Sequence, residues 1–291
     1  MPVPEVENLA ELLKEIISRL KQAGIESARL EAELILSHLF TCSRAELYLH
    51  REEKLPPEKI ARAMALAEKR ARRVPLAYLI EKAWFRELEL EIDDSVMVPR
   101  PETELLVEKA IELILSYPKV RKILDLGTGS GAIILSLAYE LKELKDQLEF
   151  YASDISERAL QLAKRNAQKY GLEKRIRFFL GDLFQPFSGE RFDLIVCNPP
   201  YIPNDAFNSL EPEVAEYEPR IALDGGEKGL EIIEQILTRA HQYLTPEGFL
   251  IMEIGAGQSE PLKSGNFPGL EFKEIKKDHQ GIERILVFRF F

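Results

Sequence analysis

The stretch that decides the fold is Lys122-Ile-Leu-Asp-Leu-Gly-Thr-Gly-Ser-Gly131, where an apolar strand runs into three alternating glycines. An apolar helical run, Ala132 to Ala138, follows at once. Glycines let the backbone turn tightly and let a ligand approach closer than a side chain would permit. Open α/β sheets bind ligands at this carboxyl end of their strands. The segment therefore predicts a strand, a ligand-binding loop and a helix.

Strand-like and helical runs alternate along the rest of the chain after Pro101. The predicted strands are 122–126, 149–154, 175–180, 192–197, 248–254, 272–276 and 283–290. Alternating strands and helices predict a mostly parallel sheet with helices on both faces. The last two strands are separated only by Asp278-His279-Gln280-Gly281, so they are expected to form a hairpin that adds an antiparallel edge strand. The predicted fold class is α/β, with a Rossmann-like sheet.

The first 75 residues follow a different, helical pattern. Leu9, Leu12, Leu13, Ile16, Ile17 and Leu20 repeat at helical spacing, and similar stripes recur until Pro75. Each helix has one apolar stripe, so together they are expected to form a small bundle. Alternation from Phe85 to Ile92, then Asp93-Asp94-Ser95 and Val96–Val98, resembles a β-hairpin. The predicted division is a helical domain at 1–82, a hairpin linker at 83–100 and a second domain at 101–291.

Composition restricts the classes of protein to consider. The chain has 45% hydrophobic and 30% charged residues, which is typical of a soluble globular protein. Its longest apolar runs are too short to span a bilayer. Cys42 and Cys197 form neither a disulfide framework nor a zinc site, and the four histidines show no metal spacing. We therefore expect a cytoplasmic protein with no membrane contact and no metal, and we expect a monomer.

The net charge of −10 is unevenly distributed. Residues 1–82 hold 14 Lys and Arg against 13 Asp and Glu, so of the chain totals of 39 and 49 the remainder keeps 25 and 36. An acidic second domain argues against tight, stable binding of nucleic acid, which needs several Lys or Arg contacts to phosphates. The basic run Lys69-Arg70-Ala71-Arg72-Arg73 is interpreted as the solvated end of a helix.

Acidic residues around the glycine loop indicate which ligand it takes. Asp154 ends the next predicted strand, where a carboxylate can accept hydrogen bonds from ribose hydroxyls. A dinucleotide site is one interpretation, because Gly127, Gly129 and Ala132 fit G-x-G-x-x-G/A. Asp125, two residues before the first glycine, gives D-x-G-x-G-x-G instead and can face a ligand's ammonium group. Gly131 also comes one position early for the pyrophosphate pattern.

The fourth predicted strand ends in Asn198-Pro199-Pro200-Tyr201. The prolines end the ladder because they have no N–H to donate, and this leaves carbonyl groups unpaired near the ligand. The Asn198 side-chain oxygen and the Pro199 carbonyl can accept both hydrogens of one –NH₂ group. Tyr201 can stack on the flat group that carries it. The tetrapeptide predicts methylation of a planar amide or amino nitrogen.

Four further segments help to identify the family of proteins that this chain resembles. They are Val98-Pro-Arg-Pro-Glu-Thr-Glu104, Tyr217-Glu-Pro-Arg220, Leu223-Asp-Gly-Gly226 with Gly229-Leu230, and Met252-Glu-Ile-Gly255. In this order, with the glycine loop and Asn-Pro-Pro-Tyr, they resemble the PrmC/HemK family of peptide chain release factor N5-glutamine methyltransferases. The resemblance covers nearly the whole chain. It implies a class I methyltransferase fold, S-adenosyl-L-methionine as cofactor, and the glutamine of the Gly-Gly-Gln motif in class 1 release factors as substrate.

The family resemblance also implies the roles of particular residues. It assigns cofactor binding to Asp125, Gly127, Thr128, Gly129, Ser130, Gly131, Asp154, Asp182, Leu183 and Asn198. It assigns glutamine binding to residues 198–201 and places the segment of Arg100 and Glu102 beside the active site. Asp182 can instead cap a turn, and family members often carry an aromatic residue at Leu183, so Phe184 is an alternative partner for adenine. For the Arg100 segment, the structural alternative is that Glu102 begins a helix and Arg100 pairs locally.

Three other functions share some of these features. A nucleic-acid amino methyltransferase would use the same tetrapeptide, but it is expected to have a basic cleft and a base-flipping recognition domain. A non-catalytic binding module could retain the fold, and intact Asn198, Tyr201 and glycines argue against it. A dehydrogenase would need a proton donor that the sequence does not suggest.

Overall fold

A computed structural model of the chain describes residues 6–291. These residues form two compact units. One comprises the chain up to Lys82 together with Glu211–Tyr217, and the other comprises Ala83–Leu210 and Glu218–Phe291. Segment 211–217 lies within the region that the sequence assigns to the second domain, yet it packs with the amino-terminal helices. Within residues 6–291, no helix is both long and apolar enough to cross a membrane.

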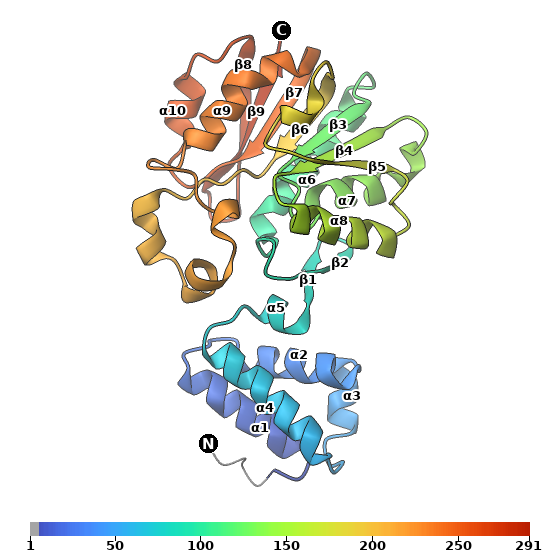
Figure 1. The fold of residues 1–291 in the computed structure, drawn as a ribbon, viewed down its shortest axis with the longest axis vertical. Helices are drawn as coiled ribbons and strands as arrows, with labels where there is room; N and C mark the ends of the chain where they lie inside the picture. Colours follow the sequence, from blue (N-terminus) through green and yellow to red (C-terminus); the bar gives the residue numbers. More distant parts are fainter. Residues whose placement is uncertain (1–5) are drawn as a thin grey trace. The chain divides into compact units, whose positions relative to one another are not determined.

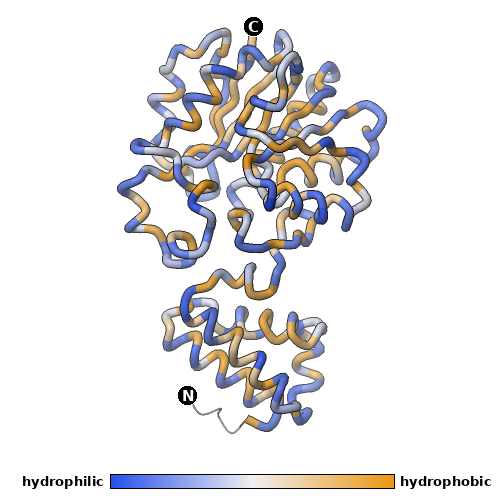
Figure 2. Tube along the Cα trace, viewed as in Figure 1, coloured by the Kyte–Doolittle hydropathy of each residue, from blue (hydrophilic) through white to orange (hydrophobic). Residues whose placement is uncertain are grey.

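The first unit is helical, as predicted (Figure 1). Its helices are α1 (Leu9–Gln22), α2 (Ala28–Phe40), α3 (Arg44–Leu49), α4 (Pro57–Ala71) and α5 (Leu76–Ile80). The core of this unit is filled by apolar residues of these helices, and orange segments recur along them in Figure 2. A capping box formed by Ser43 and Glu46 starts α3.

The basic run at the end of α4 is not a simple solvated helix end. Arg70 is 6% exposed, and its guanidinium binds Glu31 on α2 and Glu213 in the 211–217 segment. Arg73 binds the same Glu213 carboxylate, with Nε 2.8 Å from Oε2. Within the basic run 69–73, only Lys69 and Arg72 are exposed. These ion pairs hold segment 211–217 against the helices, because a buried arginine needs carboxylate partners.

The hairpin lies earlier in the chain than predicted. Its strands are β1 (Lys82–Phe85) and β2 (Leu88–Glu91), and the turn between them places Arg86 at a φ of 50°. Val96–Val98 is not a strand. The Asp93 carboxylate accepts a hydrogen bond from the Ser95 N–H at 2.9 Å, and this local turn competes with continued strand pairing.

The second unit contains the predicted sheet, with strands in the order β5-β4-β3-β6-β7-β9-β8. Their bounds are β3 (Lys122–Leu126), β4 (Glu149–Asp154), β5 (Ile176–Leu180), β6 (Phe192–Cys197), β7 (Leu244–Glu253), β8 (Leu270–Lys277) and β9 (Glu283–Phe290). The first five strands in this order, from β5 to β7, run parallel to one another. Strand β9 is antiparallel to both β7 and β8 and lies between them, one place in from the edge.

Helices cover both faces of this sheet (Figure 1). They are α6 (Glu104–Ser116), α7 (Ala132–Glu140), α8 (Glu157–Lys169), α9 (Glu231–Arg239) and α10 (Ser259–Ser264). Leu124 and Leu126 of β3 pack into the core that Ile233 and Ile236 of α9 also fill. Successive strand residues face opposite sides of a sheet, so Asp125 lies on the other face.

Candidate active site

A cavity of about 430 Å³ opens at the carboxyl ends of β3, β4 and β6, within the second unit. Its lining includes the glycine loop after β3, Asp154 at the end of β4, the Gly181–Leu183 loop after β5 and Asn198 after β6. Strands β3 and β6 are neighbours in register, with Leu126 opposite Cys197, so the loops that follow them start side by side. The volume is in the range of small-molecule sites.

The glycine loop has a backbone that only glycine adopts easily. Gly127, Gly129 and Gly131 have φ angles of 70°, 56° and 86°. A Cβ at Gly131 would come within 2.8 Å of Leu135 Cδ1 on α7, so the Leu135 side chain would have to shift. A Cβ at Gly127 or Gly129 would meet no protein atom within 4 Å, and both residues line the cavity. The loop thus leaves backbone and open space for a ligand.

Asp154 is held by the loop that it faces. Its Oδ2 accepts a hydrogen bond from the Gly129 N–H at 2.8 Å, and its Oδ1 accepts one from the Ser156 N–H at 2.9 Å. Burial raises the pKa of this carboxyl, although the backbone donors oppose the shift. Each carboxylate oxygen has a second lone pair, so Asp154 can still accept hydrogen bonds from a ligand in the cavity.

Asp125 is fully buried and is not among the residues that line the cavity. Its Oδ2 accepts a hydrogen bond from Thr128 Oγ1 at 2.7 Å, which holds the loop in place. Its Oδ1 has no hydrogen-bond partner within the described residues. Burial, with a smaller contribution from the Asp154 charge, raises the pKa of Asp125 to about 7. The structure gives Asp125 a loop-holding position, and its contact with a ligand ammonium stays a prediction.

The loop after β5 shows which apolar residue reaches the cavity. Asp182 and Leu183 both line it. Phe184, the alternative partner for adenine, is wrong for this role, because it is 0% exposed and stacks on Tyr243 with ring centroids 4.4 Å apart. Leu183 has a φ of 47°, a conformation that costs a non-glycine residue about 1–2 kcal/mol. That backbone lets Leu183 reach the cavity while Phe184 enters the core.

The tetrapeptide divides into a part that lines the cavity and a part that does not. Asn198, Pro199 and Pro200 line it, whereas Tyr201 is not among the lining residues. The Tyr201 hydroxyl instead donates a hydrogen bond to Glu253 Oε1 at 3.0 Å, and burial raises the pKa of this phenol. Stacking of Tyr201 on a substrate therefore stays a prediction. The Asn198 Nδ2 donates to Thr103 Oγ1 at 3.0 Å.

The backbone of Tyr201 is tightly enclosed, which explains the glycines of the Leu-Asp-Gly-Gly segment. A Cβ at Gly225 would lie 2.7 Å from Tyr201 Cα, and one at Gly229 would lie 2.4 Å from the Tyr201 carbonyl oxygen. Gln258 Nε2 donates to that same oxygen at 2.9 Å. Gln258 was not singled out from the sequence. It and the two glycines fix the position of the tetrapeptide.

The Pro-Arg-Pro-Glu-Thr-Glu segment borders the cavity through Pro99 and Thr103, not through Arg100 or Glu102. The predicted local pairing of Arg100 is wrong, because Arg100 Nη2 binds Glu218 Oε1, 118 residues later, at 2.6 Å. A 3-10 helix begins at Pro101 rather than Glu102, and α6 follows from Glu104. The roles assigned to Arg100 and Glu102 in substrate binding remain predictions.

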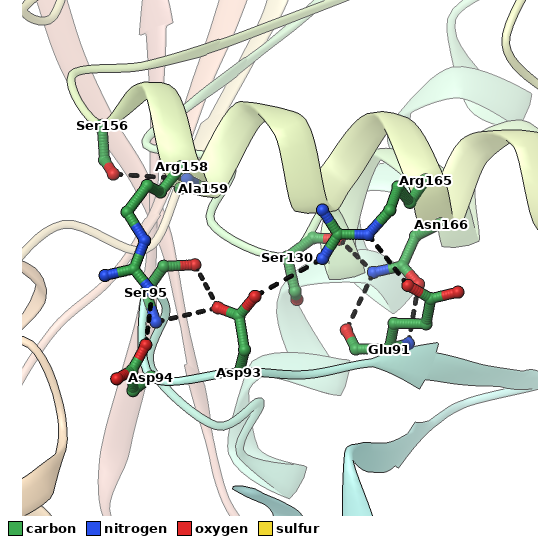
Figure 3. A network of polar contacts seen from close by, with 10 residues as sticks. All are labelled: Glu91, Asp93, Asp94, Ser95, Ser130, Ser156, Arg158, Ala159, Arg165 and Asn166. Atoms are coloured by element: carbon green, nitrogen blue, oxygen red, sulfur yellow. Dashed lines mark hydrogen bonds and ion pairs between the residues drawn. The ribbon is translucent and has the colours of Figure 1, made fainter.

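A polar network joins the chain after β2 to helix α8 and the glycine loop (Figure 3). Asn166 is 0% exposed, and its Nδ2 donates to the carbonyl oxygens of Glu91 and Ser130, each at 3.0 Å. Its Oδ1 accepts from the Glu91 N–H at 2.7 Å. This side chain thereby ties the end of β2 to Ser130, which lines the cavity. Asn166 shows no local sequence signal.

Thr103 and Glu253 lie in segments that carry the family resemblance, but sequence reasoning gave neither residue a role. Glu253 is the single carboxylate of the predicted strand 248–254, where burial without a partner would be costly. Cys197, next to Asn198, is 0% exposed, and burial raises its thiol pKa well above the usual value. It therefore packs in the strand and has little thiolate for nucleophilic chemistry.

A mostly parallel sheet with a glycine loop and an Asn-Pro-Pro-Tyr turn around one cavity defines the class of this protein as a methyltransferase with a Rossmann-like fold. Residues 119–280 match a methyltransferase domain family, and residues 11–80 match the PrmC N-terminal domain family. The release factor glutamine methyltransferase of Geobacter sulfurreducens is 39% identical over 285 residues, with 97% of each chain covered. The chain belongs to the release factor glutamine methyltransferase family.

Other relatives agree with this membership. The release factor glutamine methyltransferase of Moorella thermoacetica is 40% identical over 255 residues, with 88% of each chain covered. Among solved structures, the hMettl16 catalytic domain in complex with the MAT2A 3'UTR hairpin 6 is 18% identical, with a TM-score of 0.55 over 81% of this chain and 82% of that one. At that identity the likeness concerns the fold alone.

Proposed function

We propose that this protein transfers a methyl group from S-adenosyl-L-methionine to the side-chain amide nitrogen of the Gly-Gly-Gln glutamine in class 1 release factors. The observation that supports this most directly is the Asn198 side chain. Its Nδ2 donates a hydrogen bond to Thr103, and its Oδ1, at the wall of the cavity, accepts no hydrogen bond from the described residues. An acceptor in that position suits a substrate that brings an –NH₂ group.

The cavity residues fit the cofactor. The open space over Gly127 and Gly129 allows the cofactor to approach the backbone of the glycine loop. Asp154 can accept hydrogen bonds from the cofactor's ribose hydroxyls. Leu183 gives an apolar surface for a flat base, and Asp182 a carboxylate beside it. When bound, S-adenosyl-L-methionine supplies an electrophilic methyl group on a positively charged sulfur. Asp125 supports this site through Thr128.

The tetrapeptide orients the nitrogen that receives the methyl group. The carbonyl oxygen of Pro199 has no hydrogen-bond partner in the part of the chain that the structure describes, as is the case for Asn198 Oδ1. Two acceptors can hold both hydrogens of a primary amide, which fixes the direction of its weakly nucleophilic nitrogen. Such positioning is worth about 7–11 kcal/mol in favourable cases. Nothing in this arrangement requires a strong base.

The test is mass spectrometry of a purified class 1 release factor after incubation with this protein and S-adenosyl-L-methionine. We expect a gain of one methylene on the Gly-Gly-Gln glutamine. Asn198→Ala should lose most of this transfer while cofactor binding survives. Asn208→Ala is a matched control, because Asn208 is an exposed asparagine ten residues away with no side-chain hydrogen bond in the described chain.

Two results would contradict the proposal. Transfer to DNA or RNA in place of the release factor would assign the site to nucleic-acid amino groups. Equal transfer by wild type and Asn198→Ala would remove the tetrapeptide from the mechanism.

A further inference from the structure

Behind the Asn198 amide lies a chain of hydrogen bonds that ends at a buried carboxylate. Asn198 Nδ2 donates to Thr103 Oγ1 at 3.0 Å, and Thr103 Oγ1 donates to Glu253 Oε2 at 2.6 Å. The other carboxylate oxygen, Oε1, accepts from the Tyr201 hydroxyl at 3.0 Å. Thr103 and Glu253 are 4% and 1% exposed, so water does not replace these bonds. Three separate elements meet here: the 3-10 helix before α6, the end of β6 and the end of β7.

The chemistry of these groups fixes which atom donates and which accepts in each of these hydrogen bonds. An ionised carboxylate only accepts hydrogen bonds, so the single Thr103 hydroxyl proton must point to Glu253. The Thr103 oxygen then has only lone pairs left for Asn198. If the Asn198 amide were flipped, its oxygen would face another acceptor with no proton between them. A carboxyl that is protonated on Oε1 preserves the same direction, because Oε2 still accepts from Thr103.

We propose that Thr103 and Glu253 are positioning residues that fix the Asn198 side chain with its oxygen toward the substrate, and that they thereby select glutamine over glutamate. A glutamine side chain brings N–H donors to this oxygen. A glutamate carboxylate brings only acceptors, and two facing acceptors lose their hydrogen bonds to water without replacement. The selection is thus built from a repulsive element as well as an attractive one. This inference depends on the proposed role of Asn198.

The surroundings of Glu253 are consistent with a group whose task is to accept. Burial raises its pKa, and the Glu102 charge adds to the rise, whereas the Thr103 and Tyr201 hydroxyls and Arg284 lower it. Arg284 is already paired with Asp278 at 2.9 Å. The carboxylate is therefore held mainly by the two hydroxyl donors, and each of those donors is attached to a cavity-forming segment.

The first variant is Thr103→Val, which keeps the shape of the side chain and removes the hydroxyl. We expect kcat to fall about tenfold to hundredfold, because the Asn198 amide can then rotate, while the Kd for S-adenosyl-L-methionine stays unchanged. Thr103→Ser should restore most of kcat. Thr245→Val is the matched control: Thr245 Oγ1 donates to the Asp193 carboxylate at 2.8 Å, and neither residue lines the cavity.

The second readout is discrimination between two release factors, one natural and one with glutamate in place of the Gly-Gly-Gln glutamine. Wild type and Thr245→Val should bind the natural factor at least about tenfold more tightly, as expected when a site's hydrogen-bonding partner is missing. In Thr103→Val the ratio should approach one, because a rotated Asn198 can offer its –NH₂ group to a carboxylate. A purely structural role for Thr103 would weaken both complexes alike.

A second pair of variants asks the same question if Thr103→Val does not fold. Glu253→Gln keeps an oxygen that accepts from Thr103, so discrimination should persist. Glu253→Met has similar length and no such acceptor, so discrimination should be lost. An unchanged ratio in Thr103→Val, or equal behaviour of the two Glu253 variants, overturns this inference. If wild type itself does not methylate the natural factor, the proposed function fails, and that result is separate from these comparisons.

Discussion

The carboxyl of Asp125 makes the stability of the second unit depend on pH in a way that one substitution isolates. Its pKa is raised to about 7 in the folded protein, against an ordinary value of 3.8. The folded state therefore holds the proton more tightly than the unfolded state. The contribution of the Asp125 carboxyl to the stability of the folded protein is therefore fully present below pH ~4 and is lost as pH rises through about 7. The Asp125→Asn side chain does not titrate and can still accept from Thr128.

The size of the effect follows from the shift. Each unit of pKa difference is worth about 1.4 kcal/mol, so the advantage of Asp125→Asn over wild type should grow by about 3 kcal/mol between pH ~5 and pH ~8. Urea unfolding at both pH values measures it, with Trp84 fluorescence as the signal, since this single tryptophan lies in the second unit. Parallel unfolding free energies for the two proteins across this range would refute the reasoning.

Two further pairs of substitutions test backbone geometry. In Gly225→Ala, the new Cβ would lie 2.7 Å from Tyr201 Cα, so the tetrapeptide must move, and kcat should fall about tenfold or more. Gly171→Ala is the control, because Gly171 also has a positive φ, 66°, but no atom lies within 4 Å of an added Cβ. It should cost about 1 kcal/mol of stability and leave kcat unchanged. A similar loss of kcat in Gly225→Ala and Gly171→Ala would contradict the steric explanation. Thr41 ends α2 at a φ of 53°, a backbone conformation that glycine adopts more easily than threonine, so Thr41→Gly should stabilise this helix by about 0.5–1 kcal/mol. Native-state hydrogen exchange of α2 should then be slower. Thr41→Ala is the control, because alanine has the same backbone strain and should not slow the exchange.

Strands β3, β4 and β6 were predicted to the residue because local chemistry sets their ends, whereas β7 begins four residues before the predicted 248. The strand 122–126 ends where a glycine with positive φ follows, and 192–197 ends where prolines follow. Each was bounded by a signal within the next two residues. The hairpin was misplaced because two turn signals competed, and only packing decides between a turn at Arg86 and one at Asp93.

The residues that sequence reasoning missed act across long separations. Thr103 and Glu253 are 150 residues apart, and Arg70 and Glu213 are 143 apart. No periodicity or turn pattern relates such positions, because their partnership exists only once the sheet and the helices have formed. The glycine loop and the tetrapeptide were accessible because each carries its chemistry within a few consecutive residues.

The acidic surroundings of the cavity favour a cation there. Asp154 lines the cavity, Asp125 holds its wall through Thr128, and Glu253 holds it through Thr103. Burial raises the pKa of all three, which means that the folded protein pays a cost for each negative charge. A positively charged ligand offsets that cost, whereas a phosphate increases it. We therefore expect the site to bind a sulfonium cofactor more readily than an anionic ligand.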